Sequence, residues 1–288
     1  MVVTRLRGGL GNQMFQYACG LAVANHLKQQ LYIDRFEVDR DPRHGGYTLA
    51  EYQVPSVSGS YESSYSFKIK HKLLRRMKIF SRLESIFYFE PTFSYAPLPY
   101  DRFGDNVYLD GYWQSESYFN DIRDLLIAEF SPSYCISGKS SQLLDQIRST
   151  TSVSIHIRRG DYLSNKSANI LHGVLSLDYY NAAIDYIKQH VSEPTFYIFS
   201  DDPEWVNSQF PLADAVVASN SDKTNQKHSL DMYLMSACQH NIIANSSYSW
   251  WGAWLNQNPA KKVLAPKKWF NTSTVSSQSL VPAQWIRL

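Results

Sequence analysis

The feature that most constrains the fold is a regular alternation of short apolar runs and amphipathic segments after residue 150. The apolar runs have the length and composition of buried strands and lie at Val153–Ile157, Thr195–Phe199, Val216–Val217, Ile242–Ile243 and Val263–Leu264. Segments with apolar residues at helical spacing alternate with them, at Asp178–Gln189, Ser229–Cys238, Ser247–Leu255 and after Pro203. Because parallel strands need a long crossover, which a helix supplies, this alternation predicts a doubly wound parallel α/β domain.

A second α/β unit begins at the N-terminus. Val2–Leu6 has the pattern of a strand, and a glycine-rich turn follows at residues 7–13. Apolar residues then recur on one helical face from Met14 to Leu27, and Leu31–Ile33 has the pattern of the next strand. This is a βαβ unit whose turn lies at the carboxyl end of the first strand, where open α/β sheets bind ligands.

The middle of the chain has weaker patterns. Val107–Leu109 is predicted to be a strand and Ser117–Phe130 a helix, and the small polar residues 131–141 are typical of a linker. The length of 288 residues corresponds to about two domains. We therefore expect two Rossmann-like domains that face a cleft, residues 1–145 and 146–288.

Composition and charge exclude several classes of protein. Hydrophobic residues make up 44% of the chain, as in globular proteins, and no run of 18 apolar residues predicts a transmembrane helix. The formal net charge of +2 does not favour a nucleic-acid partner. Cys19, Cys135 and Cys238 match no zinc or redox spacing, and the N-terminus lacks the apolar run of a signal peptide. We therefore expect a cytoplasmic protein with reduced thiols.

The strongest chemical signal lies at the carboxyl end of the strand Val153–Ile157. Residues 156–162 read His-Ile-Arg-Arg-Gly-Asp-Tyr. Because side chains alternate along an extended segment, His156 and Arg158 share one face and Arg159 points away. The planar fork of Arg158 suits a phosphate oxygen. The alternative is a structural one, a surface pair of Arg159 with Asp161 that holds the loop.

A second signal follows the strand Ile242–Ile243. Asn245, Ser246 and Ser247 lie between this strand and a predicted helix. Hydroxyls and free backbone N–H groups at a helix N-terminus bind anions, although one serine can simply cap the helix. The two roles are compatible. Two strand ends that offer Arg and Ser groups in one domain favour a diphosphate site.

Two further strand ends carry polar residues. Gly9, Asn12 and Gln13 lie in a turn without the spacing of a dinucleotide motif or the Lys of a P-loop. This turn either allows close packing of the helix or presents Asn12 and Gln13 to a ligand in the cleft. Asp201 and Asp202 end another strand, where they can bind a divalent metal or cap the next helix. We favour the cap at Asp202 and expect no metal site.

Three segments resemble signature motifs of the α-1,2-fucosyltransferases. Residues 156–162 resemble the HxRRxD motif, residues 8–17 (Gly-Gly-Leu-Gly-Asn-Gln-Met-Phe-Gln-Tyr) the opening motif, and residues 245–255 the third signature of bacterial members. The resemblance covers about residues 2–270. It implies a GT-B fold, with the acceptor on the N-terminal domain and the donor on the C-terminal one. It also implies inverting transfer of L-fucose from GDP-β-L-fucose to the 2-hydroxyl of a terminal β-galactoside, without a metal or other cofactor.

The resemblance also implies roles for individual residues. Arg158 binds the β-phosphate of the donor, and His156 lies near the nucleotide. Asp231 reads the edge of guanine. The remaining donor contacts are Asn245, Ser246 and Ser247, and those to the sugar in the cleft are Gly9, Asn12 and Gln13. Arg158, His156 and Asp161 form the catalytic set, in which the base that accepts the acceptor's proton stays unassigned.

Two other functions remain open. One is a glycosyltransferase that uses another sugar nucleotide, and the other is a glycan-binding protein without catalytic activity. The resemblance implies a bacterial enzyme, and we expect at most a peripheral association with the inner face of the membrane. The basic amphipathic stretch Lys68–Arg82 can contact anionic lipid, although a solvated helix face is the interpretation we favour.

Overall fold

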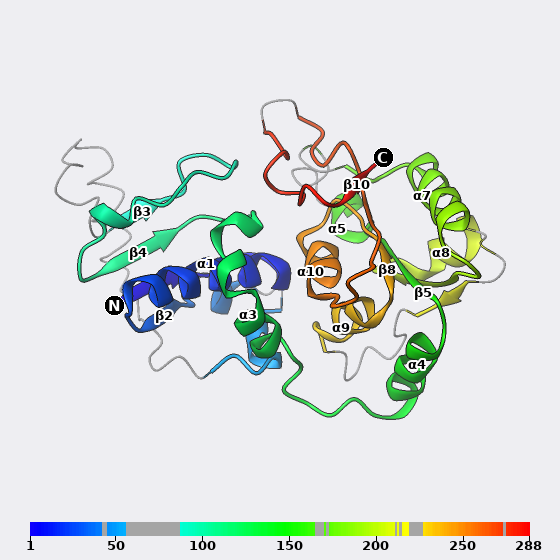
Figure 1. The fold of residues 1–288 in the computed structure, drawn as a ribbon, viewed down its shortest axis with the longest axis horizontal. Helices are drawn as coiled ribbons and strands as arrows, with labels where there is room; N and C mark the ends of the chain where they lie inside the picture. The colour runs from blue at the N-terminus through cyan, green and yellow to red at the C-terminus, as the bar shows by residue number, and fades with distance from the viewer. Residues whose placement is uncertain are drawn as a thin grey trace. The chain divides into compact units, whose positions relative to one another are not determined.

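The computed structural model describes residues 1–41, 45–55, 87–164, 170, 173–210, 212, 215–218, 227–272 and 275–288. The chain divides into two compact units, Met1–Ser131 and Pro132–Leu288 (Figure 1). The boundary expected at residue 145 lies inside helix α4 (Gly138–Ser149), which belongs to the second unit. The division therefore lies at the start of the small polar stretch 131–141.

The first unit contains a parallel four-stranded sheet in the order β2-β1-β4-β3. Its strands are β1 (Val2–Arg5), β2 (Leu31–Asp34), β3 (Phe87–Phe89) and β4 (Val107–Asp110). Helix α1 (Leu10–Leu27) connects β1 to β2 and completes the predicted βαβ unit. Strand β3 was not predicted, because Phe87 ends an amphipathic stretch that reads as a helix. The stretch Lys68–Arg82 lies outside the described residues.

The helix predicted over Ser117–Phe130 is shorter than expected. Two 3₁₀ turns, η6 (Glu116–Tyr118) and η7 (Asn120–Ile122), precede helix α3 (Arg123–Glu129). Phe119 separates the turns with a φ of −148° and buries its ring 6.0 Å from that of Phe15. Further 3₁₀ turns of this unit are η1 (Val38–Arg40), η3 (Thr48–Glu51) and η5 (Tyr100–Arg102).

The second unit contains a parallel six-stranded sheet in the order β10-β9-β8-β5-β6-β7, which confirms the expected α/β class. The strands are β5 (Ser152–Ile157), β6 (Thr195–Ser200), β7 (Val216–Val217), β8 (His240–Ile242), β9 (Val263–Ala265) and β10 (Ile286–Arg287). Besides α4, its helices are α5 (Gly160–Ser164), α7 (Leu177–His190), α8 (Pro203–Gln209), α9 (Leu230–Ala237) and α10 (Ser247–Leu255). Strand β10 was not predicted, because Ile286 and Arg287 do not form an apolar run.

The central strand β5 has two buried faces of different chemistry. Val153, Ile155 and Ile157 belong to an apolar core that they share with α7 and α8. The alternate side chains, among them His156, point to the other face, where α9 and α10 lie (Figure 1). These two helices approach closely at Gly252, because a Cβ there would lie 3.1 Å from the Cβ of Met235. Strand alternation thus directs the histidine towards α9 and α10.

Candidate active site at the carboxyl edge of the second sheet

Three neighbouring strands bring the predicted motif residues to one edge of the sheet. Strand β5 pairs with β6 on one side and with β8 on the other. Their carboxyl ends carry, in turn, the Arg158 loop, the Asp201–Asp202 pair and the Asn245–Ser247 segment. The second sheet therefore collects in space the groups that the sequence places far apart.

Asp201 organises the loop that follows β5. Its Oδ2 lies 3.2 Å from Nη1 of Arg158, and its two oxygens accept the N–H groups of Arg159 (2.9 Å) and Gly160 (3.0 Å). A Cβ at Gly160 would lie 2.9 Å from Oδ2 of Asp201, so the close approach of the carboxylate requires glycine. From the sequence, the alternatives for Asp201 were a metal ligand or a contribution to the cap of the next helix. The structure makes it the carboxylate that orients the Arg158 guanidinium.

Arg159 has a different environment from Arg158. Its Nε lies 3.2 Å from Oδ2 of Asp202, and its guanidinium stacks 3.8 Å from the ring centre of Trp205. Asp202 Oδ1 accepts the N–H of Trp205 at 3.1 Å, which confirms the expected cap of α8. The sequence analysis suggested a pair of Arg159 with Asp161, whose side chain lies outside the described part of the structure; the described partner of Arg159 is Asp202. Asp161 itself lies in the first turn of α5.

His156 is a buried, neutral imidazole. Burial, together with the positive charge of Arg158, lowers the pKa of His156 to about 3. Its ring centre lies 5.6 Å from that of Tyr248 in α10. Within the described part of the chain, Nδ1 has no hydrogen-bond partner. At neutral pH the ring is therefore uncharged and offers one unpaired nitrogen.

The segment before α10 combines structural and exposed groups. Ser246 caps the helix, since its Oγ accepts the N–H of Tyr248 at 3.3 Å. The side chain of Asn245 is buried and donates to the carbonyls of Gly173 (3.3 Å) and Trp269 (3.2 Å). Ser247, the first residue of the helix, is partly exposed. Asn245 thus connects loops, while the serines border the free N–H groups of the helix N-terminus.

Asp231 is the second residue of α9, and its carboxyl group is mostly buried. Burial alone raises the pKa of Asp231 to about 6. Among the described residues, none forms a hydrogen bond or ion pair with this carboxylate. An ionised, unpaired carboxylate costs stability, which indicates a role other than holding the fold.

The candidate residues of the first unit mainly hold their own turn. Gly9 is the N-cap of α1, and Asn12 Oδ1 accepts from Nε2 of Gln114 at 2.7 Å. Gln13 is fully buried; its Nε2 donates to two loop carbonyls and its Oε1 accepts the N–H of Thr48 at 3.1 Å. The amide of Gln13 therefore fixes the loops around α1.

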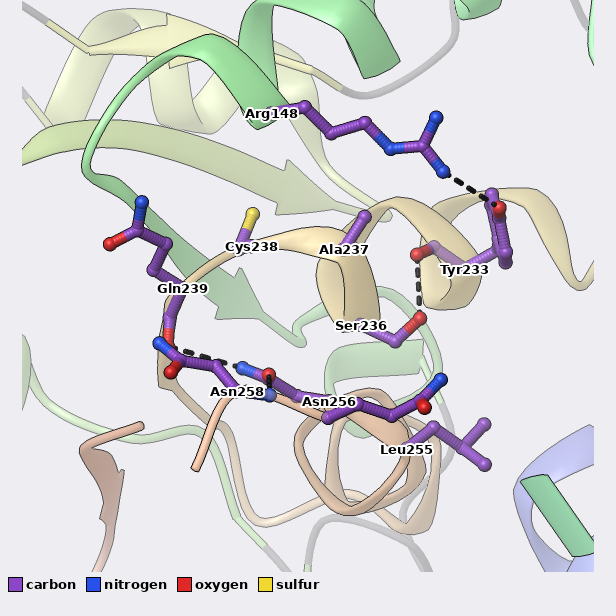
Figure 2. A pocket seen from close by; sticks show the side chains of 10 residues that line it. Arg148, Tyr233, Ser236, Ala237, Cys238, Gln239, Leu255, Asn256 and Asn258 are labelled. Carbon is purple, nitrogen blue, oxygen red and sulfur yellow. Dashed lines mark hydrogen bonds between the residues drawn. The ribbon is translucent and has the colours of Figure 1, made fainter. Parts of the chain in front are cut away.

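A cavity of about 270 Å³ lies at the other edge of the second sheet (Figure 2). It is lined by the last turns of α4, α9 and α10 and by the loops that lead into β8 and β9. The side-chain amides of Asn256 and Asn258 both donate to the backbone carbonyl of Gln239, at 3.3 and 3.0 Å. Its polar groups thus hold the connections between helices and strands, and the motif residues lie at the opposite edge.

Two further classes of feature are absent from the described residues. They contain no group of three or more His, Cys, Asp or Glu side chains that could hold a metal ion. In the same residues, no helix has both the length and the apolar character needed to cross a membrane.

Comparisons with known proteins agree with this geometry. A sequence profile of glycosyl transferase family 11 matches residues 91–288. The whole chain aligns at 34% identity with 99% of an alpha-1,2-colitosyltransferase of Escherichia coli. A similar alignment, 34% over 98% of the chain, covers 99% of the E. coli O-antigen biosynthesis glycosyltransferase WbnK. A rabbit (Oryctolagus cuniculus) galactoside alpha-(1,2)-fucosyltransferase 2 is 23% identical over 86% of the chain and 65% of its own length.

Solved structures show the same fold at low identity. The NodZ α-1,6-fucosyltransferase soaked with GDP-fucose superposes with a TM-score of 0.54 and 14% identity, over 88% of this chain and 91% of that one. A mutant of Arabidopsis thaliana FUT1 in complex with GDP superposes with a TM-score of 0.53 and 12% identity, over 99% of this chain and 75% of that one. These likenesses confirm the expected GT-B fold class of Rossmann-like units.

Proposed function

The chain belongs to glycosyl transferase family 11, and from this premise we propose that it transfers L-fucose from GDP-β-L-fucose to the 2-hydroxyl of a terminal β-galactoside. The α-1,2 linkage is supported by the activities after which a bacterial and a mammalian relative are named, an alpha-1,2-colitosyltransferase and a galactoside alpha-(1,2)-fucosyltransferase. The observation that carries the donor class is the convergence of Arg158, Ser246 and Ser247 at one sheet edge.

The chemistry that these residues supply is stabilisation of the departing diphosphate. A glycosyl–phosphate bond breaks when negative charge on the leaving oxygen is stabilised by fixed cations and N–H dipoles. The guanidinium of Arg158, oriented by Asp201, binds the β-phosphate, and the N-terminus of α10 with its two serines binds the adjacent oxygens.

Asp231 and His156 then bind the rest of the nucleotide. An ionised carboxylate at 231 accepts hydrogen bonds from guanine N1–H and the exocyclic amine. Neutral His156 lies beside the nucleotide, at the end of the strand that leads into the Arg158 loop. With its pKa far below 7, the ring lacks the second, acidic proton of an imidazolium and cannot act as a general acid towards a leaving group at neutral pH. Asp161 belongs to the catalytic set through the motif alone, and the group that accepts the proton of the 2-hydroxyl remains unassigned.

Donor competition tests this proposal directly. Transfer to a β-galactoside is measured with GDP-fucose, GDP-mannose and UDP-galactose, and the product linkage is read by NMR. We expect GDP-fucose to be the preferred donor and the product to be α-1,2-linked. Transfer from UDP-galactose alone would overturn both the donor and the role of Asp231.

A second candidate is transfer of another GDP-linked deoxysugar, favoured by the 34% identity to the colitosyltransferase. Including GDP-colitose in the competition separates the two. GDP protection against thermal unfolding separates both from a glycan-binding protein, which has no need of a nucleotide.

A further inference from the structure

The N-terminus of α9 is capped by a residue from another helix. Its own N-cap residue, Ser229, makes no capping bond, and its Oγ lies 2.9 Å from the hydroxyl of Tyr134. The hydroxyl of Tyr248 in α10 instead accepts the N–H of Met232 at 3.0 Å and donates to the carbonyl of His228 at 2.7 Å. One hydroxyl thus satisfies a free N–H in the first turn of α9 and holds the chain that enters it.

Tyr248 also contacts other parts of the candidate donor site, through its ring and its backbone N–H. Its ring centre lies 5.6 Å from that of His156 at the end of β5. Its backbone N–H donates to Oγ of Ser246, the cap of α10. Tyr248 therefore connects β5, α9 and α10, the three elements that carry His156, Asp231 and the serines.

Asp231 is the residue that depends most on this connection. It immediately precedes Met232, whose N–H is held by Tyr248, and its carboxylate has no hydrogen bond of its own among the described residues. The place of this carboxylate therefore depends on the backbone of the first turn of α9, together with the packing that buries the side chain.

We propose that Tyr248 is a positioning residue for guanine recognition: its hydroxyl, by capping α9 from α10, holds Asp231 at a fixed place relative to His156 and the phosphate-binding serines. This inference rests on the proposed GDP-sugar donor. It assigns to the tyrosine of the third signature a function in base selectivity, distinct from phosphate binding.

The test compares Tyr248→Phe with Tyr233→Phe. Both changes remove one phenolic hydroxyl. The hydroxyl of Tyr233, a residue of α9 itself, accepts from Arg148 at 3.4 Å beside the cavity at the opposite edge (Figure 2). Binding of GDP, IDP, UDP and inorganic pyrophosphate is measured by calorimetry, below the melting temperature of each protein. IDP lacks the exocyclic amine and therefore loses one of the bonds to Asp231.

We expect Tyr248→Phe to bind GDP about tenfold more weakly, to lose most of the preference for GDP over IDP, and to bind pyrophosphate as before. Tyr233→Phe should keep the wild-type values. A lower melting temperature of Tyr248→Phe with an unchanged GDP-to-IDP ratio would assign the hydroxyl to stability alone and overturn the proposal. A wild type that fails to prefer GDP over UDP would refute the proposed donor, which is a separate result.

Hydrogen exchange in the wild type provides a measurement that does not depend on folding of a variant. GDP should slow exchange of the Met232 amide, because the base engages the first turn of α9, and pyrophosphate should leave it unchanged. Equal slowing by both ligands would contradict a role in base recognition.

Discussion

At the scale of single residues, Asp231 carries a mostly buried carboxyl group. Burial raises its pKa to about 6, so the folded protein binds a proton more readily than the unfolded chain does. Its contribution to stability therefore decreases as the pH rises from about 4 through 6, and at pH 7 the ionised group is destabilising. Asp231→Asn should increase the free energy of unfolding at pH 7 by roughly 1–3 kcal/mol, measured as a higher melting temperature. A lower melting temperature would indicate that Asp231 holds the fold.

The same variant should bind GDP more weakly. The amide presents a donor to guanine N–H groups, and the unpaired contact costs about 1–3 kcal/mol. In the wild type, GDP affinity should fall as the pH drops below 6, because the protonated carboxyl loses an acceptor. The phosphates of GDP also titrate in this range, so the difference between wild type and Asp231→Asn isolates the carboxyl. Identical pH profiles would exclude the guanine contact.

Substitution of the two neighbouring arginines should affect different properties, turnover for Arg158 and stability for Arg159. Arg158→Lys keeps the charge but loses the fork, so kcat should fall by about 10²–10³ with a smaller change in GDP affinity, as for loss of one oxyanion donor. Arg159→Lys loses its bond to Asp202 and its stacking on Trp205, and should lower the melting temperature instead. Both variants are compared for kcat, GDP affinity and melting temperature. Near-normal turnover in a stable Arg158→Lys protein would refute the leaving-group role.

At the scale of elements, α8 depends on its cap. Asp202→Ala removes the acceptor for Trp205 N–H and the partner of Arg159, and should cost about 1–2 kcal/mol in chemical denaturation. Asp202→Asn is the matched control, because asparagine caps helices as well as aspartate does. If both variants lose the same stability, the ion pair matters more than the cap.

The helices and strands differ in how well they could be predicted from the sequence. Most strands and helices after residue 150 were predicted because short apolar runs alternate there with segments that have apolar residues at helical spacing. Strand β3 lies at the end of an amphipathic stretch with helical spacing, and strand β10 has one apolar residue, Ile286, so neither was recognised as an apolar run. The helix expected over Ser117–Phe130 was interrupted because tertiary packing of Phe119 overrides the local preference.

Some features of the candidate site could likewise be predicted from the sequence, and others could not. The positions of Arg158 and Ser246 could be predicted, since ligands of parallel sheets bind at strand ends. The role of Asp201 could not be predicted, because it depends on β6 lying beside β5. The order of strands across a sheet cannot be deduced from the periodicity of single segments. The contact between Tyr248 and α9 likewise arises from helix packing alone.

At the scale of the whole molecule, we expect activity without a divalent metal. Asp201 already binds Arg158 and two backbone N–H groups, and Asp202 binds Trp205 and Arg159. Transferase activity should therefore survive dialysis against EDTA. The measurement is the initial rate before and after chelation, with Mg²⁺ and Mn²⁺ added back. Loss of activity that either ion restores would reassign the two carboxylates as metal ligands.

The pairing of Arg158 with Asp201 and of Arg159 with Asp202 also has a consequence for encounter kinetics. The two cations at this sheet edge are each neutralised by a neighbouring anion before any ligand arrives. An approaching diphosphate therefore meets little net field from these four side chains, and long-range steering, which needs an uncompensated charge, contributes little. The association rate constant of GDP should accordingly vary only weakly with ionic strength, so that affinity differences among variants of this edge reside mainly in how slowly the nucleotide leaves.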